Sequence, residues 1–148
     1  MALRNVRIEG DDILRKKSRK VEKIDDRVLT ILDDMLDTMY YSDGVGLAGP
    51  QIGILKRLVV IDVDDGNVYK MINPVVTQKS GEVIGEEGCL SVPNKRGKVK
   101  RPTNVTVEYT DENGKKNELK AEGLLAICIC HELDHLEGIL FIDKIVGE

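Results

Sequence analysis

The chain has 148 residues, with 22 lysines and arginines against 26 aspartates and glutamates, a formal net charge of −4. That length suits one ordinary domain, and we predict a single domain over residues 1–148 because no repeat or linker interrupts it. The negative charge and the small number of aromatic residues argue against a nucleic-acid surface, so we expect no DNA partner. No apolar run approaches the roughly 18 residues of a membrane span, and we expect no membrane partner.

The cysteines and histidines are few. Three cysteines cannot all pair internally, and the N-terminal stretch has no apolar signal segment, which indicates free thiols in a reducing compartment. Because no Arg/Ser-rich transit segment precedes the domain, we expect the bacterial cytoplasm rather than an organelle. The only two histidines are His131 and His135, so any histidine chemistry depends on that pair.

The first predicted helix covers residues 25–41. Asp25 and Asp26 offer N-caps, and Ser42 begins a polar stretch that ends the helix. Apolar residues recur with helical spacing and form one stripe. These residues are Val28, Leu32, Met35, Leu36 and Met39.

Strand signals follow. Residues 57–63 (RLVVIDV) have the composition of a buried strand, and a turn at residues 65–67 predicts a hairpin into residues 68–72. Residues 74–90 are extended and broken by glycines. Two further strands, over residues 99–109 and 115–121, flank a second hairpin turn.

The second predicted helix covers residues 124–138, with Gly138 as its C-cap. Two helices and several short strands without regular βαβ alternation predict an α+β fold. We expect short, mostly antiparallel sheets packed around this second, central helix, with the first helix as a further N-terminal element.

A glycine motif, GVGLAG, matches the dinucleotide fingerprint G-x-G-x-x-G through Gly44, Gly46 and Gly49. That fingerprint follows a strand and opens a helix, whereas this one follows a helix and leads into Pro50 and a strand. The segment between Gly49 and the strand that begins at Arg57 is too short to contain a crossover helix. We therefore predict a bent strand in which glycines let another backbone approach closely.

Residues 131–135 read His-Glu-Leu-Asp-His. On a helix, positions i and i+4 differ by about 40° around the axis and about 6 Å along it, so His131 and His135 can hold one metal ion. Glu132 lies beside them, placed to take a proton from a metal-activated water. The alternative is a surface turn with two unrelated histidines, and the strongly apolar helix before them argues against it.

A third ligand has to come from elsewhere. A metzincin would place a histidine at position 141, which is Phe141. The downstream carboxylates Glu137, Asp143 and Glu148 are poorly placed for a thermolysin-like site. Among the thiols, Cys130 points away from the histidine face and Cys128 lies about 10 Å along the helix from His135. Cys89 is the remaining candidate.

Two imidazoles, a thiolate and one open position describe a catalytic rather than a structural site. Iron(II), zinc, nickel and cobalt all accept nitrogen and sulfur ligands, so the residues alone do not choose among them.

Three segments in order resemble the signature motifs of the peptide deformylase family: residues 44–53 (GVGLAGPQIG), 87–93 (EGCLSVP) and 131–138 (HELDHLEG). The resemblance runs from residues 12–15 to Val146. The family removes the formyl group from the N-terminal formyl-methionine of nascent bacterial and organellar proteins. The resemblance therefore implies that this chain catalyses a metal-dependent hydrolysis that releases formate. Its partners would be formyl-methionyl peptides and nascent chains.

The resemblance also implies roles for single residues. Cys89, His131 and His135 would hold one divalent ion, Fe²⁺ in the native family and Zn²⁺, Ni²⁺ or Co²⁺ in purified forms. Glu132 would be the general base and acid. The oxyanion would accept hydrogen bonds from the Leu90 N–H and the Gln51 side-chain amide.

Further residues would bind the substrate. Gly46 would pair with its backbone as an added strand. The wall of the methionine pocket would contain Val45, Glu87, Leu124, Ile127 and Cys128. Arg96 and Arg101 stand where the family often has arginines, and solvated surface charge is an equal alternative for both.

The chain departs from the family at Gly49, where alanine is usual, and at Cys130, where glutamine is usual. It also lacks the long basic C-terminal helix of some members, so we expect at most a transient ribosome contact, and we expect a monomer. The rival interpretations are an HExxH endopeptidase, against which the thiolate ligand argues, and a structural or sensory metal module in which Glu132 would be incidental.

Overall fold

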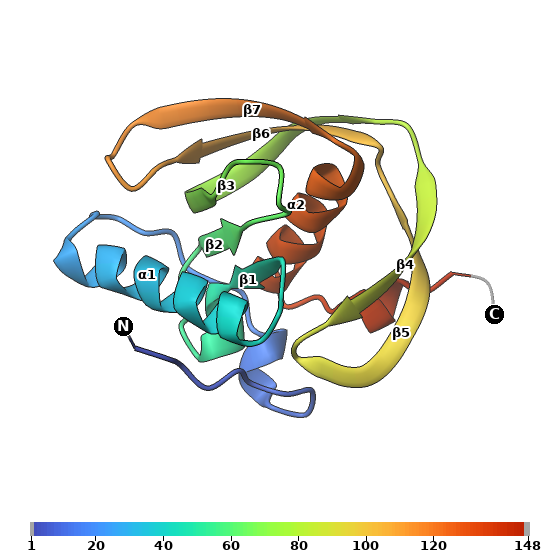
Figure 1. The fold of residues 1–148 in the computed structure, drawn as a ribbon, viewed down its shortest axis with the longest axis horizontal. Helices are drawn as coiled ribbons and strands as arrows, with labels where there is room; N and C mark the ends of the chain where they lie inside the picture. The colour runs from blue at the N-terminus through green and yellow to red at the C-terminus, as the bar shows by residue number, and fades with distance from the viewer. Residues whose placement is uncertain (1, 147–148) are drawn as a thin grey trace.

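The computed structural model describes residues 2–146. Two antiparallel sheets and two α-helices form the fold, which confirms the predicted α+β class (Figure 1). The larger sheet has five strands in the order β1-β2-β3-β6-β7: β1 (Gly46–Ala48), β2 (Leu58–Ile61), β3 (Tyr69–Ser80), β6 (Asn104–Thr110) and β7 (Lys116–Glu122). The smaller sheet pairs β4 (Val83–Cys89) with β5 (Val92–Arg101).

Helix α1 (Asp26–Tyr41) begins where the sequence predicts it. The Asp25 side chain accepts a hydrogen bond from the Val28 N–H at 3.0 Å and so caps the helix. The predicted apolar stripe is buried against β1 and β2, except that Leu36 is only partly buried. This packing fixes the edge of the larger sheet that is formed by β1.

Both predicted hairpins are present. Strands β2 and β3 pair antiparallel, with Leu58 opposite Ile72, and β6 pairs with β7 along its whole length. Asp65 and Asp111 stabilise the two turns by accepting backbone hydrogen bonds within them. These are local interactions, which explains why turn chemistry predicts them.

The predicted single strand over residues 99–109 is wrong. The chain leaves the smaller sheet after Arg101 and enters the larger sheet at Asn104. Pro102 lies at the break and has no N–H to donate to a ladder, so pairing with one partner cannot continue through it. The consequence is that the two sheets share no strand.

The glycine motif forms β1 followed by the 3₁₀ helix η2 (Gly49–Ile52) and then β2, so the motif opens no α-helix. A Cβ added at Gly49 would meet the carbonyl oxygens of Ile54 and Lys56 at 2.7 Å. The predicted close backbone approach is therefore confirmed at this glycine.

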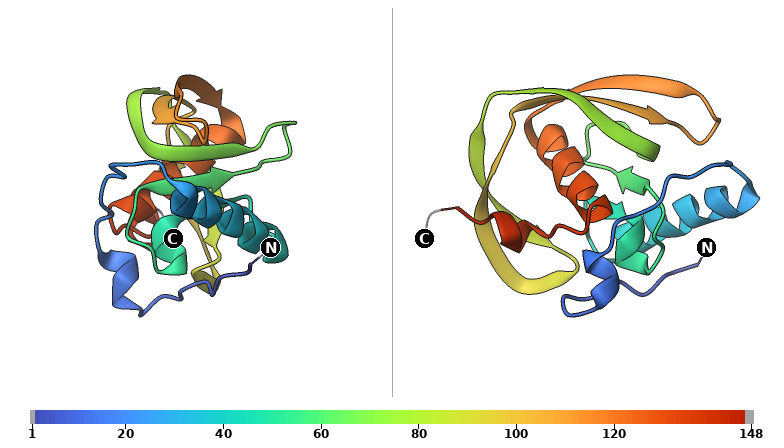
Figure 2. Two further views of the ribbon diagram at one scale, coloured as in Figure 1. Left: turned by 90° about the vertical axis from the view of Figure 1, so that its left-hand side faces the viewer. Right: turned by 180° about the vertical axis from the view of Figure 1, so that it is seen from behind.

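Helix α2 (Gly123–Leu136) lies between the larger sheet and the β4–β5 hairpin, in the centre of the molecule (Figures 1 and 2). Its apolar residues, including Ile129 and Leu136, are buried against the larger sheet. Gly138 follows in the left-handed region, φ 78°, and its N–H donates to the His135 carbonyl. No helix of the described residues is long and apolar enough to cross a membrane.

The two remaining 3₁₀ helices close the structure beside the smaller sheet. They are η1 (Asp12–Arg15) and η3 (Phe141–Lys144). Leu14 of η1 and Phe141 of η3 share a buried apolar cluster with Val92 and Val99 of β5. This cluster holds β5 next to the end of α2 that carries the histidines.

Candidate active site

Helix α2 and the end of β4 bring the three predicted metal ligands together. The Cys89 Sγ lies 3.4 Å from His135 Nε2, and one ligand atom from each of Cys89, His131 and His135 falls within 4.8 Å of the others. Both histidines are buried and Cys89 is half-buried. Two nitrogen donors and one sulfur donor at this separation fit a four-coordinate ion with one position left open.

The groups around His131 stabilise a positive charge at the site. Burial lowers the pKa of His131, but its hydrogen bonds with Cys89 and Glu87 outweigh burial and raise that pKa to about 10. The same negative groups that favour a proton on His131 would favour a metal ion in its place. Burial and the charges of His131 and Arg101 lower the pKa of His135 well below its usual value, so that this ring stays neutral and can act as a ligand.

Glu132 lies between the histidines in sequence and faces the same space. Its Oε1 is buried and has no hydrogen-bond partner within residues 2–146, as expected where a bound water or ion completes a site. Burial raises the pKa of its carboxyl to about 7, against the charges of His131 and Arg101. A carboxyl with that pKa can accept and return a proton near neutral pH.

Glu87 lines the cavity and also contacts one of the metal ligands. Its Oε1 lies 2.9 Å from His131 Nδ1, which leaves the other ring nitrogen for the metal position. Arg101 binds both Glu87 oxygens, at 2.9 and 3.0 Å, and also donates to Asp134 at 2.7 Å. Burial alone would raise the pKa of Glu87, but the hydrogen bonds from His131 and Arg101 lower it to about 2.

Arg101 is 3% exposed, so the alternative of solvated surface charge is wrong for it. Arg96, on the same strand, is exposed and pairs with Glu86 at 2.9 Å at the edge of the cavity. The two arginines therefore differ in kind: one is part of the buried network behind His131, and the other is a surface residue.

Arg101→Met is expected to lower the free energy of unfolding by about 3–5 kcal/mol, because it leaves Glu87 buried without its cation. Arg96→Met is the matched control, and removing its exposed pair should cost less than about 1 kcal/mol. Denaturant unfolding of both variants measures the difference. Equal losses would contradict the structural role given to Arg101.

The other thiols lie apart from the ligand set. Cys128 is buried in the cavity wall one turn before Glu132, and burial together with the charge of Glu132 raises its pKa. Cys130 is half-buried among apolar residues on the sheet side of α2. Both are free thiols, and neither belongs to the metal-binding group.

The downstream carboxylates are occupied elsewhere. Glu137 pairs with Arg57 at 2.7 Å, and Asp143 pairs with Arg15. Glu148 lies outside the described residues. The structure thus offers no carboxylate alternative to Cys89 among residues 2–146.

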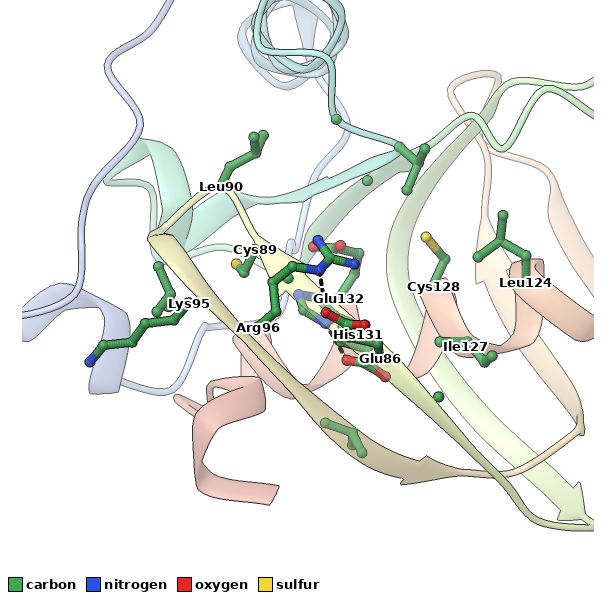
Figure 3. Close-up of a pocket in the computed structure, with 18 of the residues that line it drawn as sticks. Glu86, Cys89, Leu90, Lys95, Arg96, Leu124, Ile127, Cys128, His131 and Glu132 are labelled. Atoms are coloured by element: carbon green, nitrogen blue, oxygen red, sulfur yellow. Dashed lines mark hydrogen bonds and ion pairs between the residues drawn. The ribbon is translucent and has the colours of Figure 1, made fainter. Parts of the chain in front are cut away.

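Glu132 and His131 line a cavity of about 650 Å³. Figure 3 shows Cys89 lying near His131 and Glu132, with Leu124, Ile127 and Cys128 following one another along α2. Leu124 is 57% exposed and stands at the mouth. The substrate residues predicted from sequence all line this cavity: Val45, Gly46, Glu87, Arg96, Leu124, Ile127 and Cys128.

Several lining residues are not predicted from the sequence, among them Gly85, Pro93 and Lys95. They come from the facing strands of the β4–β5 hairpin, whose position over α2 is set by tertiary packing. Their residue types carry no chemical signal of their own.

Gln51 and Leu90 both lie next to Cys89. Gln51 is 1% exposed, and its Oε1 accepts a hydrogen bond from the Ala48 N–H at 3.0 Å. That bond orients the amide, whose Nε2 lies 3.1 Å from Ser91 Oγ and 3.5 Å from Cys89 Sγ. Leu90 follows Cys89 in the turn to β5 and also lines the cavity.

Gly46 packs directly on the glutamate of the site. A Cβ added there would meet Glu132 Oε2 at 2.6 Å. Gly46→Ala is therefore expected to displace the carboxylate and to lower kcat roughly 10- to 100-fold. Gly85→Ala is the control, since an added Cβ meets nothing within 4 Å although Gly85 also lines the cavity. Steady-state kinetics compare the two, and equal kcat values would show that Glu132 tolerates a side chain at position 46.

A buried Cys–His–His ligand set, an adjacent HExxH glutamate and an open cavity together define a metal-dependent hydrolase. The sequence profile of the polypeptide deformylase family matches residues 3–148. "Peptide deformylase 1" of Clostridium acetobutylicum is 57% identical over 145 residues, 98% of this chain and 96% of the relative. "Peptide deformylase" of Acetivibrio thermocellus is 54% identical and covers 99% of this chain and 85% of its own length.

Solved structures agree. A peptide deformylase from Thermotoga maritima superposes with a TM-score of 0.96 at 38% identity, covering 99% of this chain and 100% of its own. One from Synechococcus elongatus in complex with actinonin superposes at 0.93 with 44% identity, covering 97% of this chain and 79% of that one. The chain therefore belongs to the polypeptide deformylase family. It is a hydrolase that removes N-formyl groups from nascent peptides, and Cys89, His131 and His135 are its metal site.

Proposed function

We propose that this site hydrolyses the formyl amide of formyl-methionyl chains, with Glu132 as the acid–base residue. The observation that carries the proposal is the position of the Glu132 carboxylate. It is buried, one oxygen is free of protein partners among residues 2–146, and it faces the same cavity as the metal ligands. In this position it can take a proton from the attacking water and later return it to the leaving amine.

The metal would be held by Cys89, His131 and His135. When bound, the ion acts as a Lewis acid that lowers the pKa of a coordinated water and polarises the formyl oxygen. The Cys–His–His donor set accepts Fe²⁺, Zn²⁺, Ni²⁺ and Co²⁺ alike. Membership of the deformylase family supports Fe²⁺ as the native ion, with the others able to replace it in purified protein. The Glu87–His131 hydrogen bond would keep the ligand nitrogen pointed inward.

Two donors of the chain would stabilise the oxyanion. The Gln51 amide is already oriented by its bond to the Ala48 N–H, and the Leu90 N–H belongs to the residue next to a ligand. Preorganised donors of this kind need no rearrangement as charge develops. The unpaired edge of β1 at Gly46 would pair with the substrate backbone. Val45, Glu87, Leu124, Ile127 and Cys128 would enclose the methionine side chain, with Arg96 at the rim.

The decisive experiment is purification without oxygen, followed by metal counting and two assays. Formate release from formyl-Met-Ala-Ser is expected, with no cleavage of an internal peptide bond. Cleavage of the internal peptide alone would favour the HExxH endopeptidase instead. Bound metal with neither activity would favour a sensory module.

The setting of the enzyme is also part of the proposal. We propose that residues 1–148 act as one monomeric domain in the bacterial cytoplasm, with formyl-methionyl nascent chains as partners and at most a transient ribosome contact. The bacterial origin of both relatives described above supports this setting. Sedimentation of the metal-loaded protein tests the oligomeric state, and a dimer would overturn the monomer.

A further inference from the structure

The segment over residues 4–9, here called the N-terminal strap, runs along the lower edge of the molecule towards the β4–β5 turn (Figure 1). At one end the Arg4 side chain binds the Asp34 carboxylate of α1 at 2.8 and 2.9 Å, and the Arg4 N–H donates to Thr38 Oγ1 at 2.9 Å. Asp34 and Thr38 are buried, so the strap is fixed firmly to α1.

Two backbone hydrogen bonds then connect the strap to the site. The Arg7 N–H donates to the Gln51 carbonyl at 2.6 Å, and the Glu9 N–H donates to the Ser91 carbonyl at 2.7 Å. The spacing of two residues is that of an extended segment, which presents alternate N–H groups to the same side. Gln51 and Ser91 are both almost completely buried, at 1% and 0% exposure.

These two acceptors belong to different parts of the fold. Gln51 is in η2, which continues from β1 of the larger sheet, and Ser91 is in the turn of the smaller sheet. The sheets share no strand, so their relative position at this point depends on contacts such as Gln51 Nε2 with Ser91 Oγ and on the strap. Gln51 carries one proposed oxyanion donor, and Leu90, next to Ser91, carries the other.

We propose that the N-terminal strap positions the oxyanion donors by holding the Gln51 and Ser91 backbones at a fixed separation. Arg7 and Glu9 are then positioning residues that act through their N–H groups and touch no substrate. A side-chain contact supports the same geometry, because Lys95 Nζ pairs with Glu9 Oε1 at 3.1 Å. The inference rests on the proposed roles of Gln51 and Leu90.

Proline substitution removes a single N–H and tests the strap directly. Arg7→Pro and Glu9→Pro are each expected to lower kcat for formate release about 10-fold, since small misplacement of a catalytic group has effects of this size. KM and bound metal per chain should stay unchanged. Ile8→Pro is the matched control, because the Ile8 N–H makes no hydrogen bond with any residue from 2 to 146. Arg7→Ala separates loss of the side chain from loss of the N–H and should stay near the wild-type rate.

A double-mutant cycle distinguishes positioning from general destabilisation. If Arg7 acts through Gln51, then Arg7→Pro should lower kcat in the wild-type background and have no further effect in Gln51→Ala. An equal loss in both backgrounds, or a loss of bound metal in Arg7→Pro, would overturn the proposal. Formate release by the wild-type protein and by Gln51→Ala alone is measured first, so that failure of the proposed function is seen separately.

A milder variant covers the case in which the proline variants fold poorly. Arg4→Ala releases the anchor on α1 and keeps every strap N–H. Hydrogen exchange should then accelerate in residues 4–9, 49–53 and 89–92 but not in α2, and kcat should fall with it. Faster exchange in those segments with an unchanged kcat would show that the strap does not set the donors.

Discussion

Glu132→Gln is expected to keep the metal and to lower kcat for deformylation by roughly 10²- to 10⁴-fold, the usual range for loss of a general acid–base group. The three ligands are untouched by this change, and glutamine has the same shape as the carboxyl it replaces. What disappears is a group whose pKa of about 7 lets it exchange protons near neutral pH. KM should change little, because Glu132 is not among the residues proposed to enclose the methionine side chain.

The measurement combines metal per chain with single-turnover formate release. Glu137→Gln is the matched control, since it makes the same substitution at the end of the same helix on a partly exposed residue that pairs with Arg57. That variant should retain normal turnover. If Glu132→Gln loses metal in proportion to activity, Glu132 is a ligand and the assignment of the base is wrong.

Cys89→Ala is expected to weaken metal binding at least 100-fold and to abolish activity with it, because two imidazoles alone leave the ion half-coordinated. Cys128→Ala and Cys130→Ala should retain the metal. Cys128 sits in the cavity wall and Cys130 against the sheet, and neither belongs to the ligand group. The three variants thus remove the same atom from three different environments.

Metal per chain after dialysis against a weak chelator measures the outcome, together with the thermal midpoint before and after metal addition. Wild-type protein should gain stability when metal is restored, and Cys89→Ala should not. Metal loss in Cys128→Ala with retention in Cys89→Ala would exchange the roles of the two thiols.

Much of the fold follows from local signals. The periodicity of α1, the HExxH helix and the two hairpin turns depend on residues within a few positions of one another, and each is found where the sequence predicts it. The break at Pro102 was missed because apolar alternation continues on both sides of it. Which sheet a strand joins depends on distant partners, and strand composition does not record that choice.

The candidate site likewise contains residues that the sequence predicts and residues that it does not. The shortage of histidines points to the correct ligands, whereas the Glu87–Arg101–Asp134 network has no spacing signature. Charged residues are usually solvated, so a buried arginine is not expected from composition. One signal does exist: Arg101 is two residues after the buried Val99, so both side chains share the inner face of β5. The N-terminal strap gives no such signal, because its key bonds are made by backbone groups.

The separation of the two sheets has a mechanical consequence. Cys89 ends a strand of the smaller sheet, and both histidines lie on the helix that packs on the larger sheet. His135 comes 46 residues after Cys89 in the sequence. An ion held by all three closes a loop of that length, as a disulfide would, and for a disulfide the chain-entropy contribution is about 4 kcal/mol. The ion is then a cross-link as well as a reagent. Oxidation of the Cys89 thiolate would remove this cross-link between the β4–β5 hairpin and α2 at the same moment that it ends turnover.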